Sequence, residues 1–159
     1  WMLGGFAPVE RVVLTTNGNL QRVLAAMALR DVVVVPRYTI ARGAGMFDRE
    51  VELWLSEGDS GGLRVRVARC RSTVCVRDEA TRAAIAGQEV GLGQVLEARK
   101  TAPEFVLLGA GRSSGEPGRG VLTRQYGLRA EMIECWIHEE IDLGACLGGA
   151  LGEGAGGEA

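Results

Sequence analysis

The pattern of apolar and polar positions predicts a protein built mainly from β-strands. Strands are expected where side chains alternate between apolar and polar, or where a short apolar run is bounded by turn residues. The segments are 31–40, 49–55, 63–76, 105–108, 121–129 and 131–141. Short helices are expected at 20–29, at 78–85 and from residue 92 onward. Strands that follow one another in hairpin-like order favour an α+β fold on a single antiparallel sheet.

A chain of 159 residues predicts one domain with one core. We assign residues 1–143 to this domain. The remaining residues, 144–159, are rich in Gly and Ala, and we expect them to form a disordered tail.

Glu139 is predicted to point into the core. The last strand places it on the same face as four apolar residues, which are Ile133, Cys135, Ile137 and Ile141. A carboxylate in such surroundings is costly unless a charged or hydrogen-bonding group meets it. An arginine or a ligand could supply that group.

Arg49 has the same position on another strand. It shares a face with Val51, Leu53 and Leu55, while Glu50, Glu52 and Trp54 occupy the opposite face. Two opposite charges on two inward faces leave two interpretations open. They form either a structural ion pair with each other or a polar pocket for a ligand.

Other polar residues have simpler interpretations. Arg124 and Tyr126 share a face of the strand 121–129, where they either line a pocket or make structural cross-strand contacts. Arg112 and Arg119 are expected to be solvated. Glu134 and Glu140 are assigned to a solvated face.

Composition argues against several functional classes. Apolar residues make up 47% of the chain and the net charge is −2, so no nucleic-acid or membrane-surface partner is indicated. No apolar run is long enough to span a bilayer. The four cysteines form no CxxC pair, and the single histidine, His138, alternates away from Glu139. We therefore expect no metal site.

Four short motifs suggest a family. They are Leu14-Thr-Thr-Asn-Gly18, Arg49-Glu-Val-Glu-Leu53, Gly91-Leu-Gly-Gln-Val-Leu96 and Ile137-His-Glu139. In this order and spacing, from about Val9 to Ile141, the chain resembles the chorismate lyase (chorismate–pyruvate lyase) family. The likeness is greatest to its branch in cyanobacteria and plastid-bearing organisms. After Glu139 the chain reads Glu-Ile-Asp, where the family often has an aromatic residue followed by a proline.

The resemblance implies a fold, a reaction and a site. The fold is a six-stranded antiparallel sheet whose short helices act as flaps over an internal ligand pocket. The reaction removes pyruvate from chorismate to give 4-hydroxybenzoate, without a metal or cofactor, as a step toward quinones. By motif, the family's carboxylate-binding arginine falls on Arg49 and its essential acid/base residue on Glu139. Two flap residues that contact the ligand fall near Leu20 and on Leu92.

Three functions remain open from the sequence. The first is the lyase. The second is a non-catalytic module that binds an aromatic carboxylate, and the third is a scaffold or interaction subunit of a larger organellar assembly with protein partners. The resemblance implies a location in a plastid or the cytoplasm, and no targeting segment is recognisable within these residues.

Overall fold

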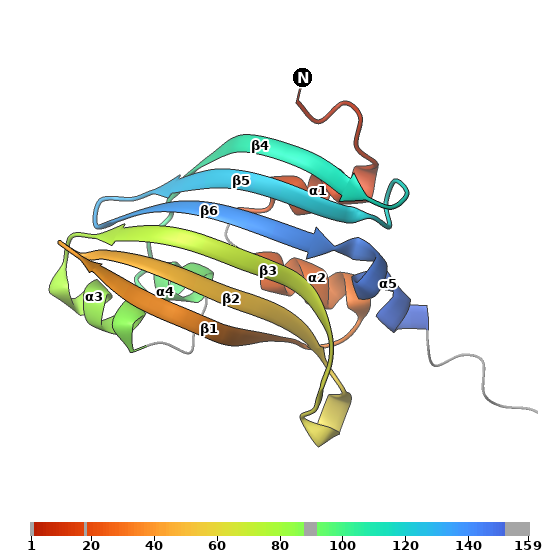
Figure 1. The fold of residues 1–159 in the computed structure, drawn as a ribbon, viewed down its shortest axis with the longest axis horizontal. Coiled ribbons are helices and arrows are strands. Elements are labelled where there is room, and N and C mark those ends of the chain that lie inside the picture. The colour runs from red at the N-terminus through yellow and green to blue at the C-terminus, as the bar shows by residue number, and fades with distance from the viewer. Residues whose placement is uncertain (1, 18, 88–91, 152–159) are drawn as a thin grey trace, which may run out of the picture.

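The computed structural model describes residues 2–17, 19–87 and 92–151. Its centre is one antiparallel sheet of six strands in the order β1-β2-β3-β6-β5-β4 (Figure 1). The strands are β1 (Val32–Gly43), β2 (Met46–Ser56), β3 (Leu63–Val76), β4 (Glu104–Ser114), β5 (Val121–Arg129) and β6 (Ile133–Asp142). The predicted α+β class with a single six-stranded antiparallel sheet is confirmed.

The sheet consists of two three-stranded meanders that meet at its centre. Strands β1, β2 and β3 follow one another, as do β4, β5 and β6, because antiparallel neighbours need only short connections. The crossover from β3 to β4 carries two helices, α3 (Glu79–Ala86) and α4 (Leu92–Ala98). The two meanders are joined by the pairing of β3 with β6. This pairing brings Glu139 into the middle of the sheet.

One face of the sheet is covered by helices. Figure 1 shows α1 (Pro8–Thr15), α2 (Leu20–Ala28) and α4 behind the sheet, while the face toward the viewer carries no helix. Buried side chains of α1 and α2, such as Leu14 and Leu24, pack with sheet residues including Leu55 and Val67 in one hydrophobic cluster. The helices therefore form a second layer on this face.

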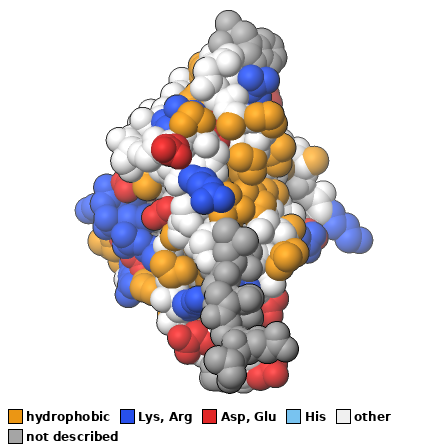
Figure 2. All heavy atoms as spheres, turned by 90° about the vertical axis from the view of Figure 1, so that its right-hand side faces the viewer, with side chains coloured by type: hydrophobic (Ala, Val, Ile, Leu, Met, Phe, Trp, Pro, Cys, Tyr) orange, Lys and Arg blue, Asp and Glu red, His pale blue; other side chains and the backbone are white. Residues whose placement is uncertain are grey.

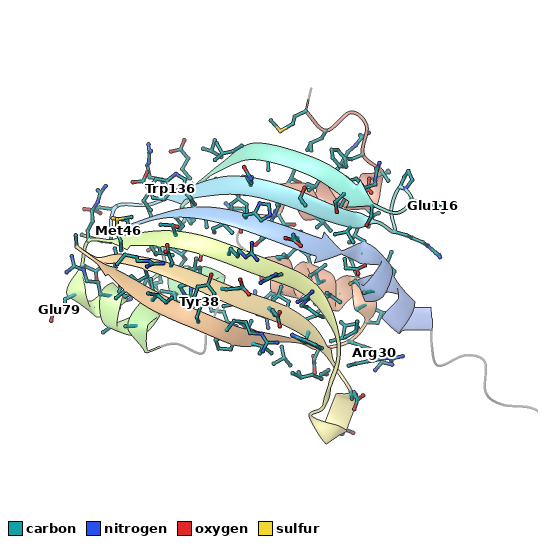
Figure 3. All side chains as sticks on the ribbon, viewed as in Figure 1. Arg30, Tyr38, Met46, Glu79, Glu116 and Trp136 are labelled. Carbon is teal, nitrogen blue, oxygen red and sulfur yellow. The ribbon has the colours of Figure 1, made fainter. Side chains whose placement is uncertain are left out.

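The alternation along β6 follows the sequence prediction. Ile133, Cys135, Ile137, Glu139 and Ile141 are all buried on the helix-covered side. Trp136, on the other side, is 47% exposed, and its side chain and that of Tyr38 are labelled on the uncovered face in Figure 3.

The uncovered face holds two buried carboxylates that the sequence pattern did not reveal. Glu50 and Glu52 of β2 are only 6% and 4% exposed. Arginine side chains from both neighbouring strands cover them. These are Arg37, Arg66, Arg69 and Arg71. Figure 2 shows this gathering of basic side chains at its left, which is the side of the uncovered sheet face.

The arginine network keeps these carboxylates charged. Burial alone would raise the pKa of Glu52, but hydrogen bonds from two arginines and the indole of Trp54 outweigh burial and lower the pKa to about 2. The pKa of Glu50 is lowered in the same way, since hydrogen bonds from Arg69 and Arg71 outweigh its burial. Arginines of the neighbouring strands thus compensate the negative charges of both carboxylates.

The structure differs from the sequence prediction at the tail. Residues 144–159 were expected to be disordered, but α5 (Leu143–Leu151) begins directly after β6. Leu143 and Cys146 are fully buried, and the Cys146 thiol lies 3.5 Å from the Leu24 carbonyl oxygen of α2. Tertiary packing overrides the low helix propensity of the glycines here. Residues 152–159 lie outside the described residues.

Two further segments were misread. Residues 9–14, for which neither a helix nor a strand is predicted, belong to helix α1, and β4 continues to Ser114 rather than ending near Leu108. Arg112 of β4, expected to be solvated, forms an ion pair with the fully buried Glu10 of α1. Gly109 and Gly111 obscured the strand pattern, because glycine contributes no side chain to the alternation.

Candidate functional site

A pocket of about 610 Å³ lies between the helix-covered face of the sheet and the helices α2 and α4. This volume is in the usual range for small-molecule sites, about 300–1,000 Å³. Its floor comes from the five strands β1, β2, β3, β5 and β6. Polar floor residues are Arg49, Cys70, Ser72, Tyr126 and Glu139. Apolar side chains such as Leu53, Leu128 and Ile137 lie among them, and further polar residues, including Asn17, Asn19 and Gln94, line the rest of the pocket.

The structure brings all four predicted site residues to this pocket. Arg49 of β2 and Glu139 of β6 contribute to the floor, and Leu20 and Leu92, the first residues of α2 and α4, contribute to the opposite wall. They come from four elements that are far apart in the sequence. Gly91, which begins one of the four motifs, lies outside the described residues.

Arg49 is a deeply buried cation. It is 3% exposed, and burial lowers the pKa of its guanidinium below the usual value. An arginine keeps its charge at neutral pH despite such a shift. In the sheet register Arg49 stands opposite Ser72, and Ser72 stands opposite Ile137. A positive charge thus lies on the pocket floor, with Ser72 beside it and Ile137 one strand further away.

Glu139 lies two residues further along the sheet. It stands opposite Cys70, with β3 between it and β2, so the strands that carry Arg49 and Glu139 are about 10 Å apart. Glu139 is 4% exposed. Its ion pair is with Arg124 of β5, whose Nε donates to Glu139 Oε2 at 2.6 Å. The interpretation of Arg49 and Glu139 as a structural pair is therefore wrong, and they form separate ends of a polar pocket.

Tyr126 completes the surroundings of Glu139. Its hydroxyl donates to Glu139 Oε1 at 2.8 Å, so both carboxylate oxygens accept a hydrogen bond. Burial raises the pKa of the Tyr126 hydroxyl well above its usual value, and the negative charge of Glu139 adds to this effect. The hydroxyl therefore remains a proton donor at neutral pH.

Arg124 extends the site behind the pocket floor. It is 1% exposed, and its Nη1 donates to the backbone carbonyls of Val13, Leu14 and Thr16 at 2.8–3.1 Å. These carbonyls end helix α1, where backbone acceptors lack intrahelical partners. The guanidinium also lies over the Tyr126 ring, 4.5 Å from its centroid. One buried side chain thus joins Glu139, Tyr126 and the end of a helix.

Arg124 and Tyr126 were left undecided by the sequence. Tyr126 lines the pocket, and Arg124 contacts the pocket through Glu139 and Tyr126. The tight connection between β5 and β6 pairs Arg129 with Glu134, and the same register places Arg124 directly opposite Glu139. Counting back from a hairpin at residues 130–132 could have found this pair.

Cys70 is a partly buried residue that stands opposite Glu139 in the sheet register. Burial raises its pKa well above the usual value, and the charge of Glu139 raises it further. The thiol therefore stays protonated at neutral pH, and a thiolate nucleophile is not formed. Cys70 contributes to the shape and polarity of the pocket floor.

The two helices over the pocket contact each other. Arg22 of α2 pairs with Glu97 of α4 at 3.3 Å, and Gln94 Nε2 donates to Gln21 Oε1, also at 3.3 Å. The charged side chains are 70% and 62% exposed, so water screens this ion pair and its contribution is small. Such a contact can hold the helices together and still open for a ligand.

No known family model matches the chain, and no curated protein matches its sequence. Within the part of the chain that the structure describes, no group of three or more His, Cys, Asp and Glu side chains could hold a metal ion. None of the described helices has both the length and the apolar character needed to span a membrane.

Proposed function

We propose that this pocket binds an aromatic or cyclohexadienyl carboxylate and that the chain is a chorismate lyase-type enzyme, which removes pyruvate from chorismate to give 4-hydroxybenzoate. One observation carries the proposal. The four residues that the family resemblance assigns to the site, Arg49, Glu139, Leu20 and Leu92, line a single pocket. They reach it from separate elements, which short sequence motifs alone do not require.

The charges of the pocket suit the two ends of such a ligand. Arg49 binds the ring carboxylate with two parallel hydrogen bonds, a geometry that the guanidinium favours. Glu139 accepts a hydrogen bond from the hydroxyl at the opposite end of the ring. Each of its oxygens already accepts one bond, from Arg124 or Tyr126, and retains a second acceptor site for the ligand.

The chemistry asks little of the protein beyond positioning. Elimination breaks the carbon–oxygen bond of the enolpyruvyl ether and removes hydrogen from the neighbouring ring carbon, which carries the hydroxyl. The ring becomes aromatic, and the released enolpyruvate takes up a proton to become pyruvate. In this proposal Glu139 accepts the ring proton. Flaps α2 and α4 exclude water, which strengthens the contacts to both residues.

The second candidate is a module that binds the same class of compound without turning it over. The hydrogen bonds from Arg124 and Tyr126 hold Glu139 as a fixed acceptor, and this arrangement suits retention of a phenol as well as catalysis. Fold alone does not decide between an enzyme and a binding module.

Incubation with chorismate tests the proposal. The purified chain is expected to release pyruvate and 4-hydroxybenzoate in equal amounts. Binding of 4-hydroxybenzoate without turnover would assign the chain to the second candidate. Failure to bind either compound at millimolar concentration would reject both.

A further inference from the structure

Arg124 occupies a position that the proposed reaction does not itself require. It has no direct role in holding a ligand carboxylate, yet it is 1% exposed and uses its guanidinium on two different parts of the molecule. Its Nε binds Glu139, and its Nη1 binds the carbonyls that end α1. Burying a guanidinium is costly, so its bonds must compensate for lost hydration.

The carbonyls bound by Arg124 immediately precede flap α2. Thr16, the last of them, is followed by Asn17 and Asn19, which line the pocket, and then by Leu20, the first residue of the flap. The end of α1 is therefore the fixed point from which the flap extends. A shift of Arg124 would displace this point and the carboxylate of Glu139 together.

The orientation of Arg124 is held on several sides. Glu139 stands directly opposite it in the register of β5 and β6, and the Tyr126 ring lies 4.5 Å below the guanidinium. The ring of Phe105 lies 5.1 Å from that of Tyr126, centroid to centroid, and limits its movement. A side chain constrained in this way can set the orientation of another.

We propose that Arg124 is the positioning residue of this pocket, which orients the Glu139 carboxylate and ties it to the base of flap α2. Contact of a ligand with Glu139 and closure of the flap are then coupled through one guanidinium. The inference deepens the proposed function and rests on it for the identity of the ligand, but the link between Glu139 and the flap exists without ligand.

A double-mutant cycle on binding of 4-hydroxybenzoate tests whether Arg124 orients the Glu139 carboxylate. R124Q is expected to lower affinity about tenfold, the size of a coupling between side chains in direct contact. In the E139Q background the same substitution should lower affinity less than about threefold, because Arg124 acts through Glu139. If the two losses multiply in the double variant, Arg124 has a merely structural role and the proposal is overturned.

Amide hydrogen exchange in α2 tests whether Arg124 ties Glu139 to the base of this helix. R124K keeps the charge but cannot bind Glu139 and three carbonyls with a planar fork, so exchange over residues 19–28 should rise about tenfold. R112K is the matched control. Arg112 binds the other end of α1 through Glu10, with Nε and Nη2 at 2.9 and 2.6 Å, and does not contact Glu139. Unchanged exchange in R124K, or an equal rise in R112K, would contradict the coupling.

The two experiments separate failure of this inference from failure of the proposed function. If the wild-type chain does not bind 4-hydroxybenzoate, the proposed ligand is wrong. Amide hydrogen exchange in α2, measured without ligand, then replaces binding affinity as the readout of the double-mutant cycle. E139Q, R124Q and the double variant should each raise exchange to a similar level, and independent effects would reject the link. Circular dichroism verifies folding, and R124K replaces R124Q in the cycle if R124Q does not fold.

Discussion

Arg49 and Glu139 line one pocket, but the groups that surround each of them differ. Arg49 is a buried cation at one end, and Ser72 stands opposite it on β3. Glu139 is already bound by Arg124 and Tyr126 at the other end. The proposed ligand brings its carboxylate to Arg49 and its hydroxyl, a hydrogen-bond donor, to Glu139.

Substitution of Arg49 should weaken binding of the carboxylate. R49A is expected to lower the affinity for 4-hydroxybenzoate by about 10- to 100-fold, because hydrogen bonds to a charged group contribute roughly 1.5–3 kcal/mol. R49K should recover little of this loss, since lysine cannot form the planar fork. Calorimetric titration measures both, and unchanged affinity in R49A would remove Arg49 from the site.

Substitution of Glu139 should reduce turnover more than stability, provided the replacement is matched in size. E139Q keeps an acceptor oxygen for Arg124 but cannot take up a proton, so turnover should fall by about 10²–10⁴-fold. E139A leaves a buried guanidinium without its partner and should cost about 3–5 kcal/mol. Steady-state kinetics and thermal unfolding separate the two effects. Wild-type turnover in E139Q would exclude acid/base chemistry at this residue.

At the scale of elements, α1 is tied to the sheet by a buried ion pair, whereas α2 and α4 are joined to each other by exposed contacts. Glu10 joins α1 to β4 through Arg112 and to the following loop through the amide of Gly118, 3.0 Å from Glu10 Oε1. The bond from Arg112 is the main cause that lowers the pKa of Glu10 to about 2, against the opposing effect of burial. The exposed Arg22–Glu97 pair of the two flaps is weak by comparison.

Acid should loosen the attachment of α1. The folded-state pKa of Glu10 lies below its ordinary value of 4.5, so its contribution is complete above pH 4.5 and is lost as pH falls toward 2. E10Q should be less stable than the wild type at pH 7, and the difference should shrink through this window. Denaturant unfolding between pH 7 and pH 2 measures it. A stability difference that persists undiminished at pH 2 would show that packing, rather than charge, is responsible.

The contact between the flaps should govern ligand release more than folding. R22A is expected to change the free energy of unfolding by less than about 1 kcal/mol, because the pair is exposed and screened. The dissociation rate of 4-hydroxybenzoate should rise, since α2 and α4 then separate more readily. Stopped-flow displacement measures this rate. A dissociation rate identical to that of the wild type would show that the flaps open without breaking this pair.

At the scale of the whole molecule, local pattern predicted the faces of the strands but did not predict which strands are neighbours. Alternation along β6 is a local property, and it placed Glu139 inward correctly. The local hairpin register of β5 and β6 sets Arg124 opposite Glu139, but the position of β3 between Glu139 and Arg49 depends on the sheet order. Strand order arises from long-range packing, and a single sequence does not display it.

The sequence also did not predict features that depend on contacts between residues far apart in the chain. Glu50 and Glu52 are buried on the uncovered face because arginines of β1 and β3 cover them, and each of these residues alone looks like an ordinary surface charge. Helix α5 is similar, since its glycines indicate a tail until Leu143 and Cys146 find partners in the core. Such features become visible only when the whole sheet is assembled.

A crystal structure with 4-hydroxybenzoate at millimolar concentration is the most direct test of the proposed site. We expect one molecule in the pocket beneath α2 and α4, with its carboxylate on the Arg49 guanidinium and its hydroxyl within hydrogen-bond distance of Glu139. An empty pocket under these conditions, or a ligand whose carboxylate points away from Arg49, would contradict it.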